Sequence, residues 1–334
     1  MKYRVLLASL VLVLASFIVA QAPQAASTIK FAHNMPPKKN ASYHLYYLKF
    51  EELAKKYTNG IEYQELPSAQ MGSDTKAAKK LQLGTFEMMA VASNNIAKYY
   101  GGFDLFTLPF LFKSLECGID HVLTDDGLLK DMSAGAEKNA NMRVLAFGVG
   151  GMRNIMNSKK PITKPADLKG VRMRVAKNPI LLDTYKALGA DAIGIAAKET
   201  YGALQTRLVD GHDGGSSWAF AHKLYEVQKH IAITGHQMVV YSVIANNKSM
   251  NKLSKKNQAG IARAAREAAT ENMAWMKVNE KKIIDHFVKS GLKMTKPDLV
   301  PFTKAVKPVW SKYAERVGGW DRINKVQNLQ KQCK

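Results

Sequence analysis

One long helical pattern near the C-terminal end constrains the fold of this chain more than any other feature. Ser254 is suited to cap a helix, and apolar residues recur at helical spacing from there to about Lys289. At about 1.5 Å per residue such a helix is roughly 50 Å long, which exceeds the span of one domain. We therefore expect it to brace two lobes of one molecule.

The N-terminal half alternates between strand and helix patterns, which predicts an α/β fold. Thr28–His33 and Ile61–Leu66 alternate apolar and polar residues, as strands with one buried face do. Ser42–Lys56 and Asp74–Leu83 have the apolar spacing of amphipathic helices. This order predicts a largely parallel sheet flanked by helices.

Two later strand patterns point to a pair of lobes. Met142–Gly150 is strand-like and leads directly into Arg153, and Met238–Ala245 is a β-branched run long enough to cross between lobes. In open parallel sheets, ligands bind in the crevice at the carboxyl ends of the strands. Two facing lobes would turn that crevice into a cleft that closes by a hinge motion.

The first residues have the pattern of a secretory signal peptide. Lys2 and Arg4 precede an apolar run that ends at Ala20, and small residues follow it. The run is shorter than the roughly 20 residues of a membrane-spanning helix. We expect cleavage after Ala25 or Ala26 and export of a soluble mature chain.

The chain is strongly basic, with a formal net charge of +22. An exported protein meets little nucleic acid, and the lysines are scattered through helical patterns, as on solvated helix faces. A general positive field would instead help to recruit anionic solutes. We expect no nucleic-acid partner.

The two cysteines, Cys117 and Cys333, leave two alternatives open. An oxidising compartment would permit a disulfide between them, which would tie the C-terminal tail to the first lobe. Otherwise Cys117 is a buried thiol and Cys333 is a free thiol in a frayed tail.

Two arginines share one face of a predicted strand. Val171, Met173 and Val175 alternate with Arg172 and Arg174, so the apolar residues would face the core and both arginines the opposite side. A guanidinium fixed on a rigid strand suits bidentate capture of a carboxylate or a similar oxyanion. The alternation alone does not choose between the two arginines.

Three ordered motifs resemble those of one protein family. ADLKGVRMRV is preceded by GMR and followed by YGALQTRLVDG, and together they resemble the solute-binding proteins of tripartite ATP-independent periplasmic (TRAP) transporters, of the dicarboxylate-binding type. The resemblance runs from about Ile29 to about Lys312. It implies a two-lobed α/β periplasmic binding protein fold with a ligand cleft between the lobes, crossing strands and a long lobe-spanning helix.

The chain is therefore divided as follows. Residues 1–26 form the signal peptide, 27–150 with 240–279 form lobe I, and 151–239 with 280–334 form lobe II.

The resemblance also assigns ligand-binding roles to particular residues. Arg174, rather than Arg172, matches the arginine that fixes the anionic group of the ligand, and Arg153 matches a second arginine found in many relatives. Asn34 matches a polar position that contacts ligand in some members. The neighbouring His33 is interpreted as a structural histidine.

Further candidates lie on both sides of the expected cleft. Asp213 fits an acidic place of the family, whereas Gly214 and Gly215 replace bulkier residues and would expose backbone N–H groups to an oxyanion. Trp218 would wall the pocket or pack in the core. From lobe I and the crossing strand we add three more candidates: Ser93, Asn94 and Tyr241. A plain turn remains the alternative for the first two.

The expected ligand is a small organic anion. The small Ala197 stands where sugar-acid-binding relatives carry an aromatic residue, which disfavours a bulky sialic-type acid. A C4-dicarboxylate, another small carboxylate or a sulfonate fits this pattern.

The expected function is that of a receptor in the periplasm that delivers this anion to the small and large membrane subunits of a TRAP permease. We expect no cofactor, no metal site and no catalytic residues, because the sequence has neither a catalytic motif nor a tight metal-ligand spacing. An ABC-type receptor and, less so, a secreted enzyme are the alternatives.

Overall fold

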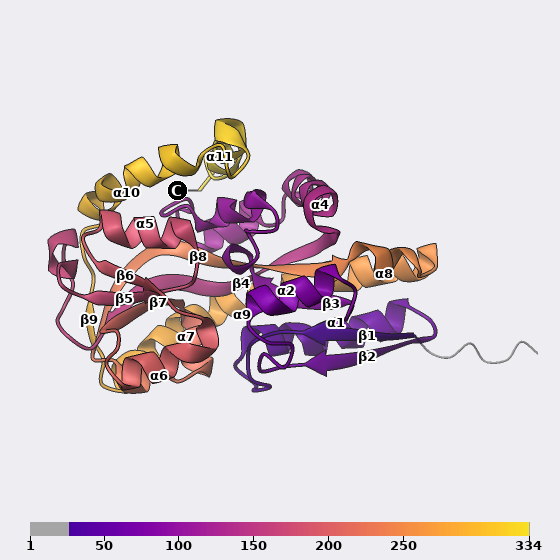
Figure 1. Cartoon of the computed structure of the whole chain (residues 1–334), viewed down its shortest axis with the longest axis horizontal. Helices are drawn as coiled ribbons and strands as arrows, with labels where there is room; N and C mark the ends of the chain where they lie inside the picture. Colours follow the sequence, from indigo (N-terminus) through magenta and orange to yellow (C-terminus); the bar gives the residue numbers. More distant parts are fainter. Residues whose placement is uncertain (1–26, 334) are drawn as a thin grey trace, which may run out of the picture.

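The computed structural model describes residues 27–333, so the expected signal peptide lies outside the described residues. These residues form one nine-stranded sheet in the order β2-β1-β3-β8-β4-β7-β5-β6, with β9 paired to β8 (Figure 1). The strands are β1 (Ser27–Ala32), β2 (Ile61–Leu66), β3 (Met88–Ala92), β4 (Met142–Asn157), β5 (Arg172–Val175), β6 (Asp191–Gly194), β7 (Gly211–Gly215), β8 (His230–Asn246) and β9 (Lys293–Thr295).

Helices cover the sheet in both lobes. The α-helices are α1 (Ser42–Tyr57), α2 (Asp74–Gln82), α3 (Leu115–Cys117), α4 (Asp126–Ala140), α5 (Pro179–Ala187), α6 (Thr200–Gln205), α7 (Ser216–Ala221), α8 (Asn247–Asn251), α9 (Lys255–Lys289), α10 (Val300–Tyr313) and α11 (Gly319–Leu329). Shorter turns that matter below are η1 (Ser93–Asn95), η2 (Gly101–Thr107) and η3 (Gly118–Val122).

The expected parallel pairing is present in each lobe. In lobe I, β1 pairs in parallel with β2 and β3, and in lobe II, β5 pairs in parallel with β6 and β7. The two halves are joined by β4 and β8, which run antiparallel to each other through the middle of the molecule (Figure 1). This confirms the two-lobed α/β fold.

Both crossing strands are longer than their sequence patterns indicated. The expected strand that ended at Gly150 continues to Asn157, so Arg153 lies within β4 and not just beyond its end. Gly151 has φ +90°, and the register of β4 against β8 shifts between Val149 and Met152. A glycine tolerates this backbone conformation without strain, so the strand absorbs an extra residue as a bulge and continues.

The long helix predicted from the sequence is α9, with 35 residues. Ser254 Oγ accepts a hydrogen bond from the backbone N–H of Asn257, as the capping prediction required. The helix packs against α1 in lobe I and against α7 in lobe II. It therefore braces both lobes.

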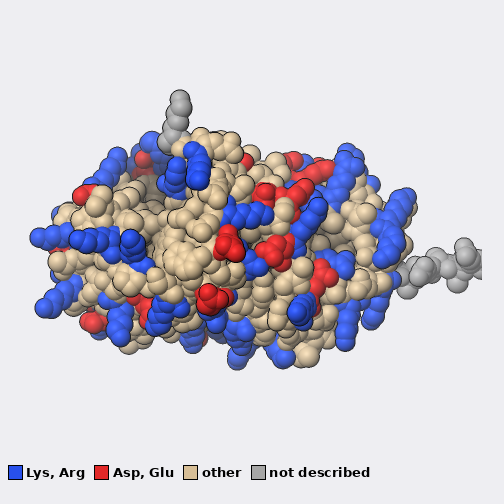
Figure 2. Space-filling model, turned by 90° about the horizontal axis from the view of Figure 1, so that it is seen from above, with Lys and Arg blue, Asp and Glu red and all other residues tan. Residues whose placement is uncertain are grey.

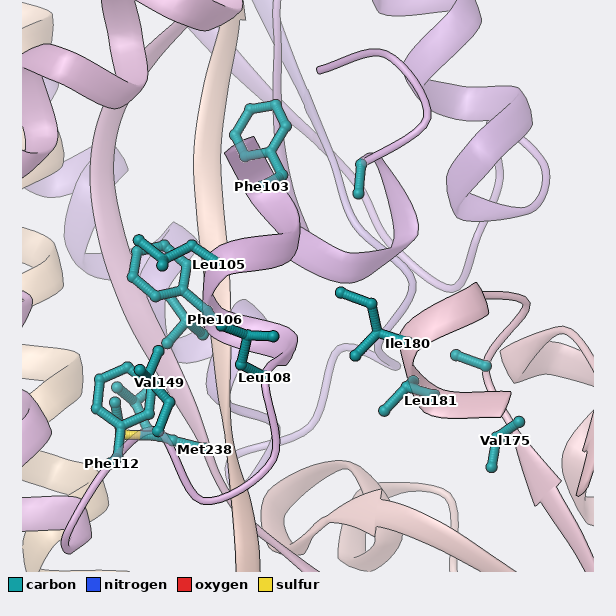
Figure 3. Close-up of a cluster of buried hydrophobic side chains, with 14 of the residues drawn as sticks. Phe103, Leu105, Phe106, Leu108, Phe112, Val149, Val175, Ile180, Leu181 and Met238 are labelled. Atoms are coloured by element: carbon teal, nitrogen blue, oxygen red, sulfur yellow. The ribbon is translucent and has the colours of Figure 1, made fainter. Parts of the chain in front are cut away.

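A continuous apolar core runs between the crossing strands and lobe II. Figure 3 shows Phe106 and Leu108 beside Val149 of β4 and Met238 of β8, with Ile180 of α5 farther along the same buried cluster. Large aromatic and β-branched side chains fill this space because both faces of the crossing strands are covered.

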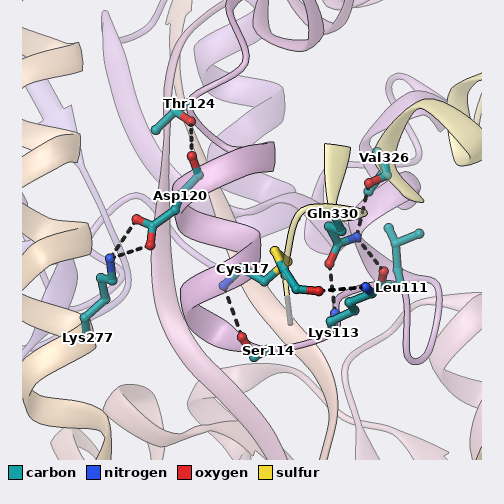
Figure 4. Close-up of a disulfide and its surroundings, with 10 residues drawn as sticks. Leu111, Lys113, Ser114, Cys117, Asp120, Thr124, Lys277, Val326 and Gln330 are labelled. Atoms are coloured by element: carbon teal, nitrogen blue, oxygen red, sulfur yellow. Dashed lines mark hydrogen bonds and ion pairs between the residues drawn. A yellow bond between two sulfur atoms is a disulfide. The ribbon is translucent and has the colours of Figure 1, made fainter. Parts of the chain in front are cut away.

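The structure joins Cys117 to Cys333 in a disulfide (Figure 4), which decides between the two alternatives left by the sequence. Gln330 strengthens this attachment, because its side chain accepts from the N–H of Lys113 at 2.8 Å and donates to the carbonyl of Leu111 at 3.0 Å. The tail after α10 is thereby fixed to lobe I.

The C-terminal segment contacts both lobes. Helix α10 packs on α5 of lobe II, whereas Arg316 pairs with Asp104 of lobe I at 2.6 Å and α11 packs on η3. The division that placed residues 280–334 in lobe II therefore does not describe the contacts of the last residues.

Candidate functional site

A cleft of about 1050 Å³ lies between the two lobes. Its walls come from the loops after β1 and β2, the start of α2, the ends of β5 and β6, and the end of α7. Among the residues that line it are Asn34, Asp74, Asn95, Arg174, Ala197 and His222.

The two arginines of β5 differ in burial and in their partners, although they occupy equivalent places in the alternating sequence pattern. Arg172 is partly exposed and forms an ion pair with Asp210, with Nη2 2.7 Å from Oδ1. Arg174 is only 3 % exposed and lines the cleft. Its Nε and Nη2 donate to the carbonyl of Ile195 at 3.0 and 2.7 Å.

Arg174 is a buried cation without an acidic partner. Within residues 27–333 no carboxylate oxygen lies within 4.0 Å of its guanidinium nitrogens. Burial lowers the pKa of Arg174 to about 10, so the side chain is still cationic at neutral pH. The indole of Trp218 lies against the guanidinium, 5.2 Å from ring centroid to Cζ.

Arg153 connects groups from both lobes. Its Nη1 donates to the carbonyl of Asp213 at 2.5 Å and lies 3.3 Å from the Oδ1 of the same residue. Its Nη2 contacts Asn94 Oδ1 at 3.4 Å. Unlike Arg174, this guanidinium already has a carboxylate partner.

Asp213 is fully buried in β7. Burial raises the pKa of its carboxyl, but Arg153 first, and then the neighbouring His236 and Arg174, outweigh this effect and hold the pKa below its ordinary value. Neither carboxylate oxygen accepts a hydrogen bond within the described part of the chain. The carboxylate is therefore ionised and has free acceptor capacity.

Several other buried polar atoms near Asp213 lack partners among the described residues. They are Arg153 Nε, both ring nitrogens of His212 and Trp218 Nε1. Burial lowers the pKa of His212 to about 3, so its ring is neutral. Buried polar groups are normally hydrogen-bonded, and leaving several unpaired in one place is costly. Such a cluster is typical of a site built for a polar ligand.

Gly214 has a different structural role from the one expected. A Cβ at this position would lie 2.5 Å from Cε3 of Trp218, so the missing side chain makes room for the indole. The glycine is buried in β7 under that ring. This packing role comes in addition to the expected contact of its backbone N–H with an oxyanion, which stays a prediction.

The structure places the remaining candidates as follows. Asn34 lines the cleft, and Asn94 contacts Arg153. Ser93 Oγ hydrogen-bonds Ser242 Oγ at 2.9 Å, away from the cleft lining. Tyr241 is completely buried in the core of lobe I, with its ring 4.4 Å from that of Tyr43. It packs in the core and does not line the cleft.

Asp74 is a cleft residue that the sequence reading missed. Its Oδ2 accepts from the side-chain amides of Asn95 at 2.5 Å and Asn34 at 2.9 Å. Burial raises the pKa of Asp74, although both amides and Arg174 oppose that shift. In the sequence it reads as an ordinary acidic residue in the first turn of a helix, so no local signal distinguishes it.

Figure 2 shows lysine and arginine side chains spread over the whole visible face, with acidic residues between them. The charges on this face do not gather into one basic stripe of the kind that binds a nucleic-acid backbone.

A model of the bacterial extracellular solute-binding proteins, family 7 (DctP), matches residues 31–316. The chain belongs to this family. Its members are solute-binding receptors rather than enzymes. No helix among residues 27–333 is long and apolar enough to cross a membrane.

Individual relatives match over most of their length. The C4-dicarboxylate-binding periplasmic protein DctP of Rhodobacter capsulatus is 31 % identical over 303 residues, 87 % of each chain. The 2,3-diketo-L-gulonate-binding periplasmic protein YiaO of Escherichia coli is 28 % identical over 81 % of each chain.

Solved structures share the whole fold. A TRAP periplasmic solute-binding protein from Shewanella oneidensis with bound succinate has a TM-score of 0.84 and 24 % identity, covering 92 % of this chain and 100 % of that one. One from Anaerococcus prevotii with bound D-glucuronate has a TM-score of 0.83 and 26 % identity, covering 91 % and 97 %.

Proposed function

We propose that this chain is a periplasmic receptor that captures a small organic anion and delivers it to the membrane subunits of a TRAP transporter. One observation carries the proposal: Arg174 is a buried cation that lines the cleft and has no acidic partner among residues 27–333. A buried cation without a directly paired anion is costly, so the site favours a ligand that places a negative charge in contact with Arg174.

Arg153 and Asp213 are proposed to contact a part of the ligand other than its anionic group. Because Asp213 already neutralises Arg153, the pair adds no net charge. The carboxylate oxygens of Asp213, which accept no hydrogen bond within residues 27–333, can take a donor from the ligand but would repel a second carboxylate at close range. We therefore expect the ligand to present one anionic group to Arg174 and a hydroxyl or another donor to Asp213.

The relatives support an organic acid as the ligand class. Those above are named for, or contain, a C4-dicarboxylate, 2,3-diketo-L-gulonate, succinate and glucuronate. Two of these are sugar acids, so a hydroxylated carboxylate joins the simple dicarboxylate as a candidate. A small sulfonate stays the rival head group.

Delivery follows from closure of the lobes. The bulge at Gly151 in β4 interrupts its pairing with β8 in the middle of the molecule, and we expect the lobes to rotate about this point. The closed, loaded form would dock on the small and large permease subunits. The expected signal peptide, residues 1–26, would take the chain to the periplasm.

A binding screen tests this function. Purified mature protein is titrated calorimetrically with succinate, glucuronate, glucose and a matched carboxylate and sulfonate pair. We expect at least one anion to bind and glucose not to bind, because glucose leaves Arg174 without a counter-charge. Tight binding of glucose, or turnover of a bound acid, would contradict the proposal.

A further inference from the structure

Two histidines and one glutamate converge in lobe I, next to the cleft. His33 directly follows β1, His44 lies in the first turn of α1, and Glu65 lies in β2. Glu65 Oε1 is 2.7 Å from His33 Nε2 and 2.6 Å from His44 Nδ1. The three ligand atoms all lie within 4.8 Å of one another.

The fold fixes this convergence. Because β1 and β2 are parallel and Phe31 is paired with Glu65, both strands end at the same edge of the sheet. Helix α1 begins nine residues after His33 and brings His44 over that edge. The His33 side chain is 0 % exposed, and those of His44 and Glu65 are 14 % and 16 % exposed. Side chains held in this way are preorganised and still reachable from solvent.

We propose that His33, His44 and Glu65 form a binding site for a divalent transition-metal ion, with Zn²⁺ as the best-suited ion. Two imidazole nitrogens and one carboxylate oxygen are one of the donor sets found in three-ligand zinc sites, which keep a fourth position for water. Ligands at about 2.0–2.2 Å from a tetrahedral ion lie roughly 3.3 Å apart, so small side-chain rotations suffice.

A bound cation would replace the present contacts, in which the Oε1 of Glu65 is the shared partner of the His33 and His44 rings. Glu65 Oε1 now contacts both rings at once. A metal ion placed between the three groups would bind both ring nitrogens and the oxygen directly. The site is separate from the anion site, although Asn34, the residue after His33, lines the cleft.

Isothermal titration of zinc chloride into chelator-treated, tag-free protein at about pH 7.5 tests the proposal. We expect one ion per chain. Cobalt(II), used as a spectroscopic probe, should give the intense visible absorption of a tetrahedral N/O site.

Matched variants locate the ion. His44→Gln and Glu65→Gln keep polar side chains of similar size, and each removes one of the three proposed ligands. Each should therefore weaken zinc binding by at least the roughly 10–100-fold that loss of an outer-shell partner costs. His121→Gln, in η3, changes a histidine outside the cluster and should leave zinc affinity unchanged. Circular dichroism checks that every variant is folded.

Two outcomes would overturn the proposal. One is the absence of stoichiometric zinc binding to the parent protein. The other is full zinc affinity in a folded His44→Gln, Glu65→Gln double variant, which would leave the cluster as an ion-pair network only. Neither outcome depends on whether an organic anion binds in the cleft.

Discussion

Replacing Arg174 with methionine should separate ligand binding from folding. Methionine has a similar length and fills the buried space, but it removes the positive charge and every N–H donor. Removal of one partner of a buried ion pair costs about 2–5 kcal/mol of binding free energy. At about 1.4 kcal/mol per tenfold change, the dissociation constant should rise by about 30-fold to a few thousandfold.

The thermal stability of the ligand-free protein should not fall with the loss of ligand affinity. Arg174 forms no direct ion pair within residues 27–333, and Asp213, Asp74 and Glu199 attract its charge only from farther away. Arg174→Met therefore removes a buried charge that is only partly compensated, and an apolar side chain suits the buried site. Two hydrogen bonds to the carbonyl of Ile195 are lost, which offsets part of this gain. We expect the melting temperature of the free variant to equal or exceed that of the parent protein.

Arg172→Met is the matched control, two residues away on the same strand. Arg172 is paired with Asp210 near the surface, where solvent screens the pair, so its loss should change stability little and leave ligand affinity unchanged. Calorimetry with the best anion from the screen measures both affinities. Equal losses in the two variants, or full affinity in folded Arg174→Met, would refute the reasoning.

Four further predictions concern Trp218 beside Arg174, the buried Glu280, the disulfide and the closure of the lobes. Gly214→Ala should push Trp218 away from Arg174, because the new Cβ would lie 2.5 Å from the indole, and calorimetry should show about tenfold weaker anion binding. The control variant Gly202→Ala, where the new Cβ meets open space, should bind the anion with the affinity of the parent protein. Burial raises the pKa of the Glu280 carboxyl to about 7, so the stability linked to its protonation is present at acidic pH and lost as pH rises through about 7. In urea unfolding, Glu280→Gln should therefore be more stable than the parent protein by roughly 2–4 kcal/mol at about pH 8.5 and similar to it at about pH 4. Equal stabilities of variant and parent at both pH values would contradict this prediction. Replacing Cys117 and Cys333 together by serine should lower the unfolding free energy by about 2–5 kcal/mol, whereas no change would mean that the tail is held by its other contacts. Small-angle scattering should give a smaller radius of gyration with saturating anion, and an unchanged radius would argue against lobe closure.

The fold was predictable where apolar residues recur along a segment with the spacing of a single kind of element, either a strand or a helix. The alternation of Ile61–Leu66 and the helical spacing after Ser254 gave elements that match β2 and α9. The end of β4 was not predictable in the same way, because Gly151 reads as a break in a strand pattern. Only its pairing with β8 makes that glycine a bulge, and such pairing is a long-range property.

The candidate site was predictable only in part, for a similar reason. The family resemblance selected Arg174 over Arg172, but the physical distinction is the presence of Asp210 beside one and not the other. Asp74 and His212 gave no signal, because their roles depend on burial next to residues distant in the chain. Tyr241 lies on the expected crossing strand, but its ring points into the core of lobe I.

The surroundings of Arg174 also decide which of its edges a ligand can use. The face of the guanidinium lies against Trp218, and that contact exists because Gly214 has no side chain. The edge that carries Nε and one N–H of Nη2 donates to the carbonyl of Ile195. The remaining free edge is the end formed by Nη1 and the second N–H of Nη2. Two parallel N–H groups at that end match the two oxygens of a carboxylate. An organic acid that approaches end-on therefore brings the number of paired N–H donors of this buried cation from two to four of its five, and the second N–H of Nη1 is left for another acceptor on the ligand.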